Sequence, residues 1–209
     1  MASFVEKRRL LAFVAYTGKS MAHLVPISRD SLGALHRSLR AATRNDHIEV
    51  DRLTGQLDLT RREEYGRFLS IHHVVLQELR SEWRPEDRED FRAMSRRLQN
   101  DLRVLGFPTA SPPSTSQIAL AKGNQLGIAY VIRGSRLGAR VLRPRIPSHF
   151  SASYFDFVPA LSWAQFLAQL QSVSNSADAQ VSDAAIQGAK ETFGLFARLL
   201  SKPRDSAPV

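Results

Sequence analysis

Residues 116–142 read SQIALAKGNQLGIAYVIRGSRLGARVL, an apolar and basic run that proline ends at positions 144 and 147. Its spacing predicts one long helix, although each glycine inside a helix costs about 1 kcal/mol relative to alanine. At about 100° per residue, its four glycines fall within a wedge of roughly 60°, and Tyr130 lies beside them. They are Gly123, Gly127, Gly134 and Gly138. The helix therefore presents a face without side chains, which something can approach closely.

Two interpretations of that bare face stay open at this point. Glycines at such spacing most often allow another helix to pack tightly against the backbone. The alternative is a flat ligand that lies across the helix, whose pocket a local kink at the glycines would widen or close. The glycine spacing alone favours packing.

The rest of the chain predicts further helices and no strand. Apolar residues recur at three- and four-residue steps within residues 32–42, 65–79, 85–105, 163–170 and 181–200. Thr60 and Glu63 have the spacing of a capping box, and Gly106 is expected to stop the helix that Pro85 starts. We therefore expect one all-α domain over residues 28–200, with an N-terminal extension at 1–27 and a disordered tail at 201–209.

The composition excludes several classes of protein. There is no cysteine, so the chain has no disulfide, iron–sulfur cluster or zinc knuckle. No apolar run reaches the roughly 20 residues that a membrane span needs. The basic residues before Leu10 imitate a signal peptide, but no convincing cleavage site follows. We expect a cytoplasmic protein.

The positive charge gathers in one part of the chain. The net charge is +9, and residues 101–150 hold seven basic residues against a single acid. Such a field attracts nucleic acid, an acidic protein or an anionic small molecule. Arg133, Arg136, Arg140 and Arg143 recur at helical spacing, which predicts either a solvated charged face or a docking patch.

One histidine has a distinctive neighbourhood. His47 follows Thr43 by one helical turn and precedes Asp51 by one turn. A histidine that ligates iron commonly gives its other ring N–H to a carboxylate, which fixes its tautomer and orientation. The plain alternative is a surface histidine near an aspartate. His72 and His73 lie in an apolar helix, where at least one is expected to pack in the core.

These signals resemble a known family when they are taken in order. Leu39–Thr43 followed by His47 and Asp51 resembles the proximal helix of heme oxygenases, and Tyr130–Ala139 resembles their distal-helix motif in its bacterial form. Two later pairs are similar to the closing helices: Trp163 with Phe166, and Ala184-Ala185 with Thr192-Phe193. The resemblance spans roughly residues 30–200. It implies a heme-oxygenase-like fold with heme between a proximal and a distal helix.

The resemblance implies a role for each matching residue. His47 would be the iron ligand, and Asp51 the acid that supports it. Gly134 and Gly138 would bring their backbone over the heme, and Ser135 stands where animal members have a water-ordering aspartate. The remaining expected heme contacts are Arg40, Thr43, Tyr130 and Ala139, of which Ala139 replaces a glycine of the animal motif.

Two departures from the family pattern concern charge. Arg133 stands where bacterial members usually have glutamate. Leu167 and Gln171 are uncharged where animal enzymes offer lysine and arginine to the heme propionates. Arg40 or the basic run Arg133–Arg145 would have to supply that charge.

The implied activity is oxidative cleavage of heme to biliverdin, CO and iron with O2. Electrons would come from an external donor such as a ferredoxin or a reductase, and a bacteriophytochrome is a conceivable bilin acceptor. One alternative is a heme carrier or sensor without activity on the same fold. A thiaminase-type hydrolase would want a cysteine or a carboxylate cluster, and a nucleic-acid binder is disfavoured because glycines break the basic helix.

Overall fold

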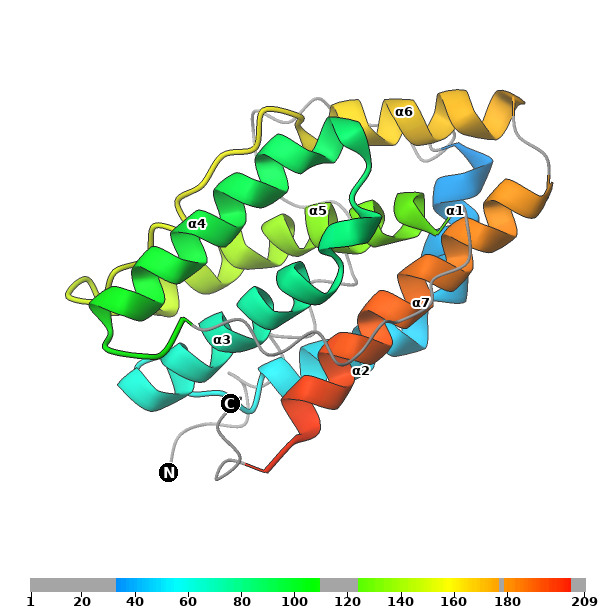
Figure 1. Cartoon of the computed structure of the whole chain (residues 1–209). Helices are drawn as coiled ribbons and strands as arrows, with labels where there is room; N and C mark the ends of the chain where they lie inside the picture. Colours follow the sequence, from blue (N-terminus) through cyan, green and yellow to red (C-terminus); the bar gives the residue numbers. More distant parts are fainter. Residues whose placement is uncertain (1–32, 110–123, 177–178, 204–209) are drawn as a thin grey trace.

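The computed structural model describes residues 33–109, 124–176 and 179–203 (Figure 1). Seven α-helices and three short 3-10 turns account for most of these residues, and no strand occurs among them, which confirms the all-α prediction. The helices are α1 Ala34–Ala42, α2 Arg44–Thr54, α3 Arg62–Glu78, α4 Arg88–Val104, α5 Gln125–Leu142, α6 Trp163–Ser176 and α7 Ala179–Ser201. The turns are η4 Arg80–Glu82, η5 Pro85–Asp87 and η6 Arg143–Arg145.

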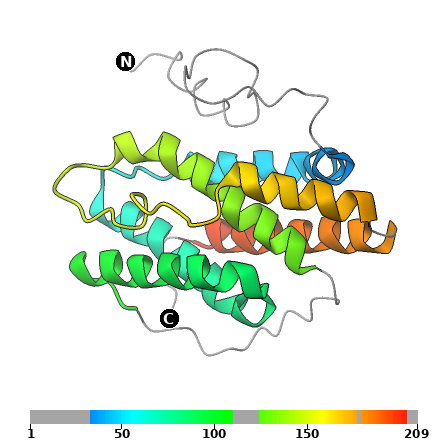
Figure 2. The ribbon, with the colours of Figure 1, turned by 90° about the horizontal axis from the view of Figure 1, so that it is seen from above.

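Helix α7 organises the bundle. It packs most extensively against α5 and also contacts α1, α2 and α3. Helix α3 pairs with α4, and α1 pairs with α6. Figure 2 shows α4 and α2 on opposite sides of the bundle with α7 between them. The glycine-rich α5 therefore has α7 as its main neighbour in the fold.

The core is aliphatic and aromatic. Its largest fully buried side chains include Tyr65, Tyr154, Phe91 and Phe166. Each such side chain stabilises the fold by about 1.5–3 kcal/mol relative to exposure in water. In the described part of the chain, no helix is long and apolar enough to cross a bilayer.

The helix ends agree with the sequence in one place and differ in another. Gly106 has φ of 75° and follows α4, as its predicted role as a stop requires. The predicted capping box is wrong, because α3 begins at Arg62 behind an extended Arg61 and no side chain caps it. The Thr60 hydroxyl, which a capping box would use at the start of the helix, instead donates to the Asp58 carboxylate.

Some predictions fall outside the described residues. The extension at 1–27 lies wholly outside them, and so does most of the tail at 201–209. Helix α5 is described from Gln125 onward, so Gly123 and the first part of the predicted helix 116–142 also lie outside.

Candidate functional site

Helix α2 carries His47 and Asp51 on one face. The Nδ1 atom of His47 lies 3.1 Å from Asp51 Oδ2, and both side chains are a quarter exposed. The ring also meets Phe193 of α7 edge-on, with centroids 5.4 Å apart. A carboxylate on Nδ1 favours the tautomer that keeps the proton there, which makes Nε2 the nitrogen with the lone pair. The structure thus brings together the pair that the spacing predicted.

The direction of α2 is set by a break at Thr43. This residue separates α1 from α2 with φ of −106° and ψ of 9°. Its hydroxyl donates to the Leu39 carbonyl at 2.8 Å, and the side chain is buried. The His47 amide then donates to the Thr43 carbonyl at 2.9 Å. Thr43 therefore acts on the site through the backbone that presents His47.

The glycine face of α5 is divided between two surroundings. A Cβ on Gly127 would lie 2.5 Å from the Ala189 amide nitrogen and closer still to the Ala185 carbonyl oxygen, so helix packing explains this glycine. A Cβ on Gly134 would meet only the Trp163 ring, at 3.7 Å, which is ordinary contact. Gly138 is half-buried on the same helix, and Ala139 packs in the core. Packing thus accounts for the first part of the stripe and leaves Gly134 without a packing reason.

An aromatic cluster borders Gly134. Tyr130 lies 5.7 Å from Trp163 and 5.9 Å from His36 between ring centroids. Burial, with the nearby charge of Arg40, lowers the pKa of His36, and burial raises the pKa of Tyr130 to about 12. Both rings are therefore neutral at pH 7. No sequence pattern singles out His36, because no acidic residue follows it one helical turn later.

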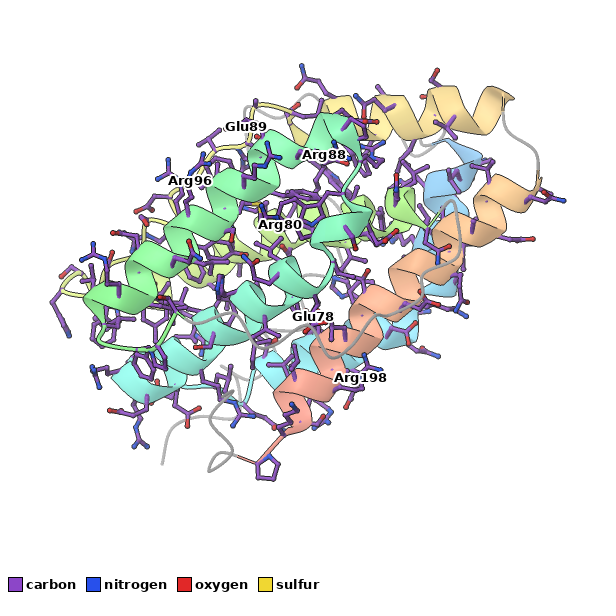
Figure 3. All side chains as sticks on the ribbon, in the orientation of Figure 1. Glu78, Arg80, Arg88, Glu89, Arg96 and Arg198 are labelled. Carbon is purple, nitrogen blue, oxygen red and sulfur yellow. The ribbon has the colours of Figure 1, made fainter. Side chains whose placement is uncertain are left out.

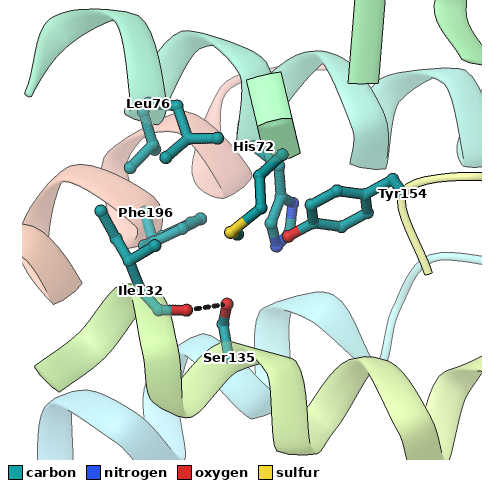
Figure 4. A pocket seen from close by; sticks show the side chains of 8 residues that line it. His72, Leu76, Ile132, Ser135, Tyr154 and Phe196 are labelled. Carbon is teal, nitrogen blue, oxygen red and sulfur yellow. Dashed lines mark hydrogen bonds between the residues drawn. The ribbon is translucent and has the colours of Figure 1, made fainter. Parts of the chain in front are cut away.

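Ser135 lies about 100° around the axis of α5 from Gly134 and faces residues of α3, α4 and α7. Its hydroxyl donates to the Ile132 carbonyl at 2.7 Å and borders a cavity of about 10 Å³ (Figure 4). That is about the space of one water molecule. His72, Met94 and Tyr154 are among the other lining residues. The cavity places Ser135 near the polar side chains of His72 and Tyr154, which are distant from it in the sequence.

His72 lines the same cavity. Its Nδ1 lies 2.9 Å from the Phe68 carbonyl, and burial lowers its pKa to about 4. The ring is therefore neutral at pH 7, with Nδ1 as donor to Phe68 and Nε2 as acceptor. His73 is buried and His72 is half-buried, so the prediction that at least one of them packs in the core is confirmed.

The basic face predicted on α5 is wrong for two of its members. Arg133 is buried between Asp87, at 2.6 Å, and Asp90, at 3.0 Å. Arg136 is buried and donates to the carbonyls of Tyr154, Phe155 and Phe157. Arg143 pairs with Asp156 at 2.7 Å, and Arg140 is exposed. Neither buried arginine can serve a docking patch or a propionate, because α4 and the loop after η6 cover them.

Comparison with known proteins gives one related sequence. No model of a protein family matches the chain. A protein of Xanthomonas campestris pv. campestris (strain 8004) named heme oxygenase is 35% identical over 151 residues. The matched region covers 64% of this chain and 87% of that protein.

Proposed function

The chain belongs to the heme oxygenase family, and on this premise we propose that it cleaves heme to biliverdin, CO and iron with O2 and external electrons. The observation that supports the proposal most directly is the pair His47 and Asp51 on α2. Heme is the substrate in this scheme. Its iron supplies the oxygen chemistry when it is bound, and the protein supplies position and surroundings.

The residues present fit a heme on chemical grounds. A neutral imidazole backed by a carboxylate is a suitable axial ligand for iron. Gly134 offers α5 backbone to which no other backbone packs closely, so a flat macrocycle can approach it. We assign His47 as the ligand, Asp51 as its support, and Tyr130, Gly134, Gly138 and Ala139 as the distal face.

Charge and water complete the proposed site. Arg40 is exposed on α1 close enough to Tyr130 and His36 to influence the pKa of both. With Arg133 and Arg136 engaged elsewhere, Arg40 is our candidate for the propionates. Ser135 would hold water on the distal side, because its hydroxyl already borders a cavity of one-water size. Thr43 would orient His47 through the α1–α2 break.

Electrons would have to come from another molecule. The chain has no cysteine and no recognisable flavin motif, so we propose an external donor such as a ferredoxin or a reductase. A bacteriophytochrome as bilin acceptor stays a prediction, and so does a cytoplasmic location.

The test adds hemin, then reductant and air, to the purified protein. We expect the Soret band to fall while bilin absorption rises, and His47→Ala to lose most of this turnover. His149→Ala is the matched control, because His149 is an exposed loop residue. A shifted Soret band without any bilin would identify a heme carrier instead. Equal rates in wild type and His47→Ala would refute the ligand assignment.

A further inference from the structure

A surface hollow lies where α3 ends and α4 begins, on the side of the bundle opposite to α2. Its volume is about 470 Å³, within the usual range of small-ligand sites. The residues that line it include Gln77, Glu78, Arg80, Trp83, Arg88 and Arg92. Figure 3 shows Glu78, Arg80 and Arg88 on the side of the molecule that carries α3 and α4. The hollow is therefore separate from the proposed heme site.

The hollow carries positive charge that its neighbours do not neutralise. Within the described residues, Arg80, Arg88 and Arg92 form no ion pair, and Glu78 is the one acid among the lining residues. Of the nearby acids, Glu82 accepts from the Ser81 hydroxyl at 3.2 Å and forms no ion pair within the described residues, and the others pair with arginines that do not line the hollow. Glu86 and Asp87 pair with Arg84, Asp87 and Asp90 pair with Arg133, and Glu89 pairs with Arg96. Three guanidinium groups and one carboxylate leave a formal charge of +2.

An unpaired donor in the wall is the second observation. Trp83 is only 3% exposed, and its indole N–H has no hydrogen-bond acceptor among the described residues. A buried donor without an acceptor costs about 1–3 kcal/mol. Arg88 donates to the Trp83 carbonyl at 3.4 Å, so one of the charged groups is tied to the same residue. A ligand with acceptor oxygens in the hollow would satisfy the guanidinium groups that lie beside this buried indole.

We propose that this hollow binds a small oxyanion of charge near −2, with phosphate or carboxylate groups as the recognised chemistry. Arginine presents paired N–H donors that match both kinds of group. The net charge of the lining residues matches a dianion. By contrast, Arg96 and Glu89, which are also on α4, form an exposed ion pair with each other.

Trp83 provides the readout. Trp83 and Trp163 are the two tryptophans of the chain, so Trp163→Phe leaves Trp83 as the reporter of fluorescence. We expect inorganic pyrophosphate, succinate or both to change its emission along a saturating curve at constant ionic strength. A response to pyrophosphate alone assigns a phosphate ligand, and a response to succinate alone assigns a carboxylate.

Variants decide whether the binding is local. Arg88→Gln should weaken the apparent affinity at least tenfold, while the exposed control Arg96→Gln should stay within twofold. Calorimetric titration of the unaltered chain repeats the measurement if Trp163→Phe does not fold. The proposal is overturned if KCl alone gives the same change, if neither anion saturates, or if Arg96→Gln weakens binding as much as Arg88→Gln.

Discussion

Replacing Gly127 and Gly134 one at a time by alanine distinguishes the two interpretations of the glycine face, which are helix packing and the approach of a ligand. At Gly127, the new methyl group would lie 2.5 Å from the Ala189 nitrogen and closer to the Ala185 oxygen. Because both atoms belong to the α7 backbone, α5 and α7 would have to separate by more than about 1 Å to restore contacts near 3.5 Å. Overpacking of this kind costs about 1–3 kcal/mol, and rigid backbone on both sides favours the upper end.

The gain in helix propensity offsets part of that loss. Alanine recovers about 1 kcal/mol relative to glycine, so Gly127→Ala should lower the free energy of unfolding by about 2 kcal/mol. For a chain of this size, that corresponds to a fall in Tm of about 4–8 °C. At Gly134 the nearest atoms are Trp163 ring carbons at 3.7 Å, so Gly134→Ala should keep the stability or raise it by up to about 1 kcal/mol.

In heme turnover, the two variants should differ in the opposite way from their difference in stability. Gly134→Ala places a methyl group against the proposed heme face and should reduce bilin formation in a fully folded protein. Urea unfolding followed by circular dichroism gives the stabilities, and the hemin assay gives the rates. The reasoning fails if Gly127→Ala is as stable as wild type, or if Gly134→Ala is the variant that unfolds.

Three further predictions follow from the same geometry. Gly138→Leu should fold but lose heme turnover, and a normal rate in the folded variant would show that Gly138 does not face the substrate. Arg133→Met leaves the buried Asp90 without an arginine and Asp87 with Arg84 alone, and it should cost about 3–5 kcal/mol in urea unfolding. The exposed control Arg140→Met should change stability by less than about 0.5 kcal/mol, and a loss below about 1 kcal/mol in Arg133→Met would contradict the buried cluster. Because the pKa of His72 is about 4 when folded against 6.5 for the free side chain, the unfolded chain binds more protons as pH falls from 6.5 to 4, and stability falls through that window. His72→Phe should shrink the difference in unfolding free energy between pH 7 and pH 5, and an unchanged difference would show that His72 does not titrate this way.

Local spacing was enough for the parts of the fold that depend on nearby residues. Apolar residues at three- and four-residue steps predicted the helices, and Gly106 predicted the end of α4. The contact between His47 and Asp51 also follows from spacing alone, because residues four apart share one helix face. The capping box failed for a local reason too, since Asp58 competes for the Thr60 hydroxyl.

Long-range partners explain what the sequence did not show. The spacing of Arg133 and Arg136 says that they share a side of α5, but not that this side is covered. Their acceptors come from Asp87, Asp90 and the loop carbonyls at Tyr154–Phe157, which are 18 to 46 residues away. Gly127 and Gly134 look alike in the sequence, and only the path of α7 distinguishes them.

The buried cluster around Arg133 also constrains how this chain can diverge. A change of Arg133 to glutamate would put three acids together at a buried site, with Arg84 as their remaining arginine partner among the described residues. Restoring balance would then require new residues at both Asp87 and Asp90. A lineage that exchanges arginine for an acid at position 133 must therefore pass through a weakened intermediate or acquire the changes jointly. Positions 87, 90 and 133 should accordingly be inherited as a set, so the charge at position 133 in a related sequence predicts the charges at the other two.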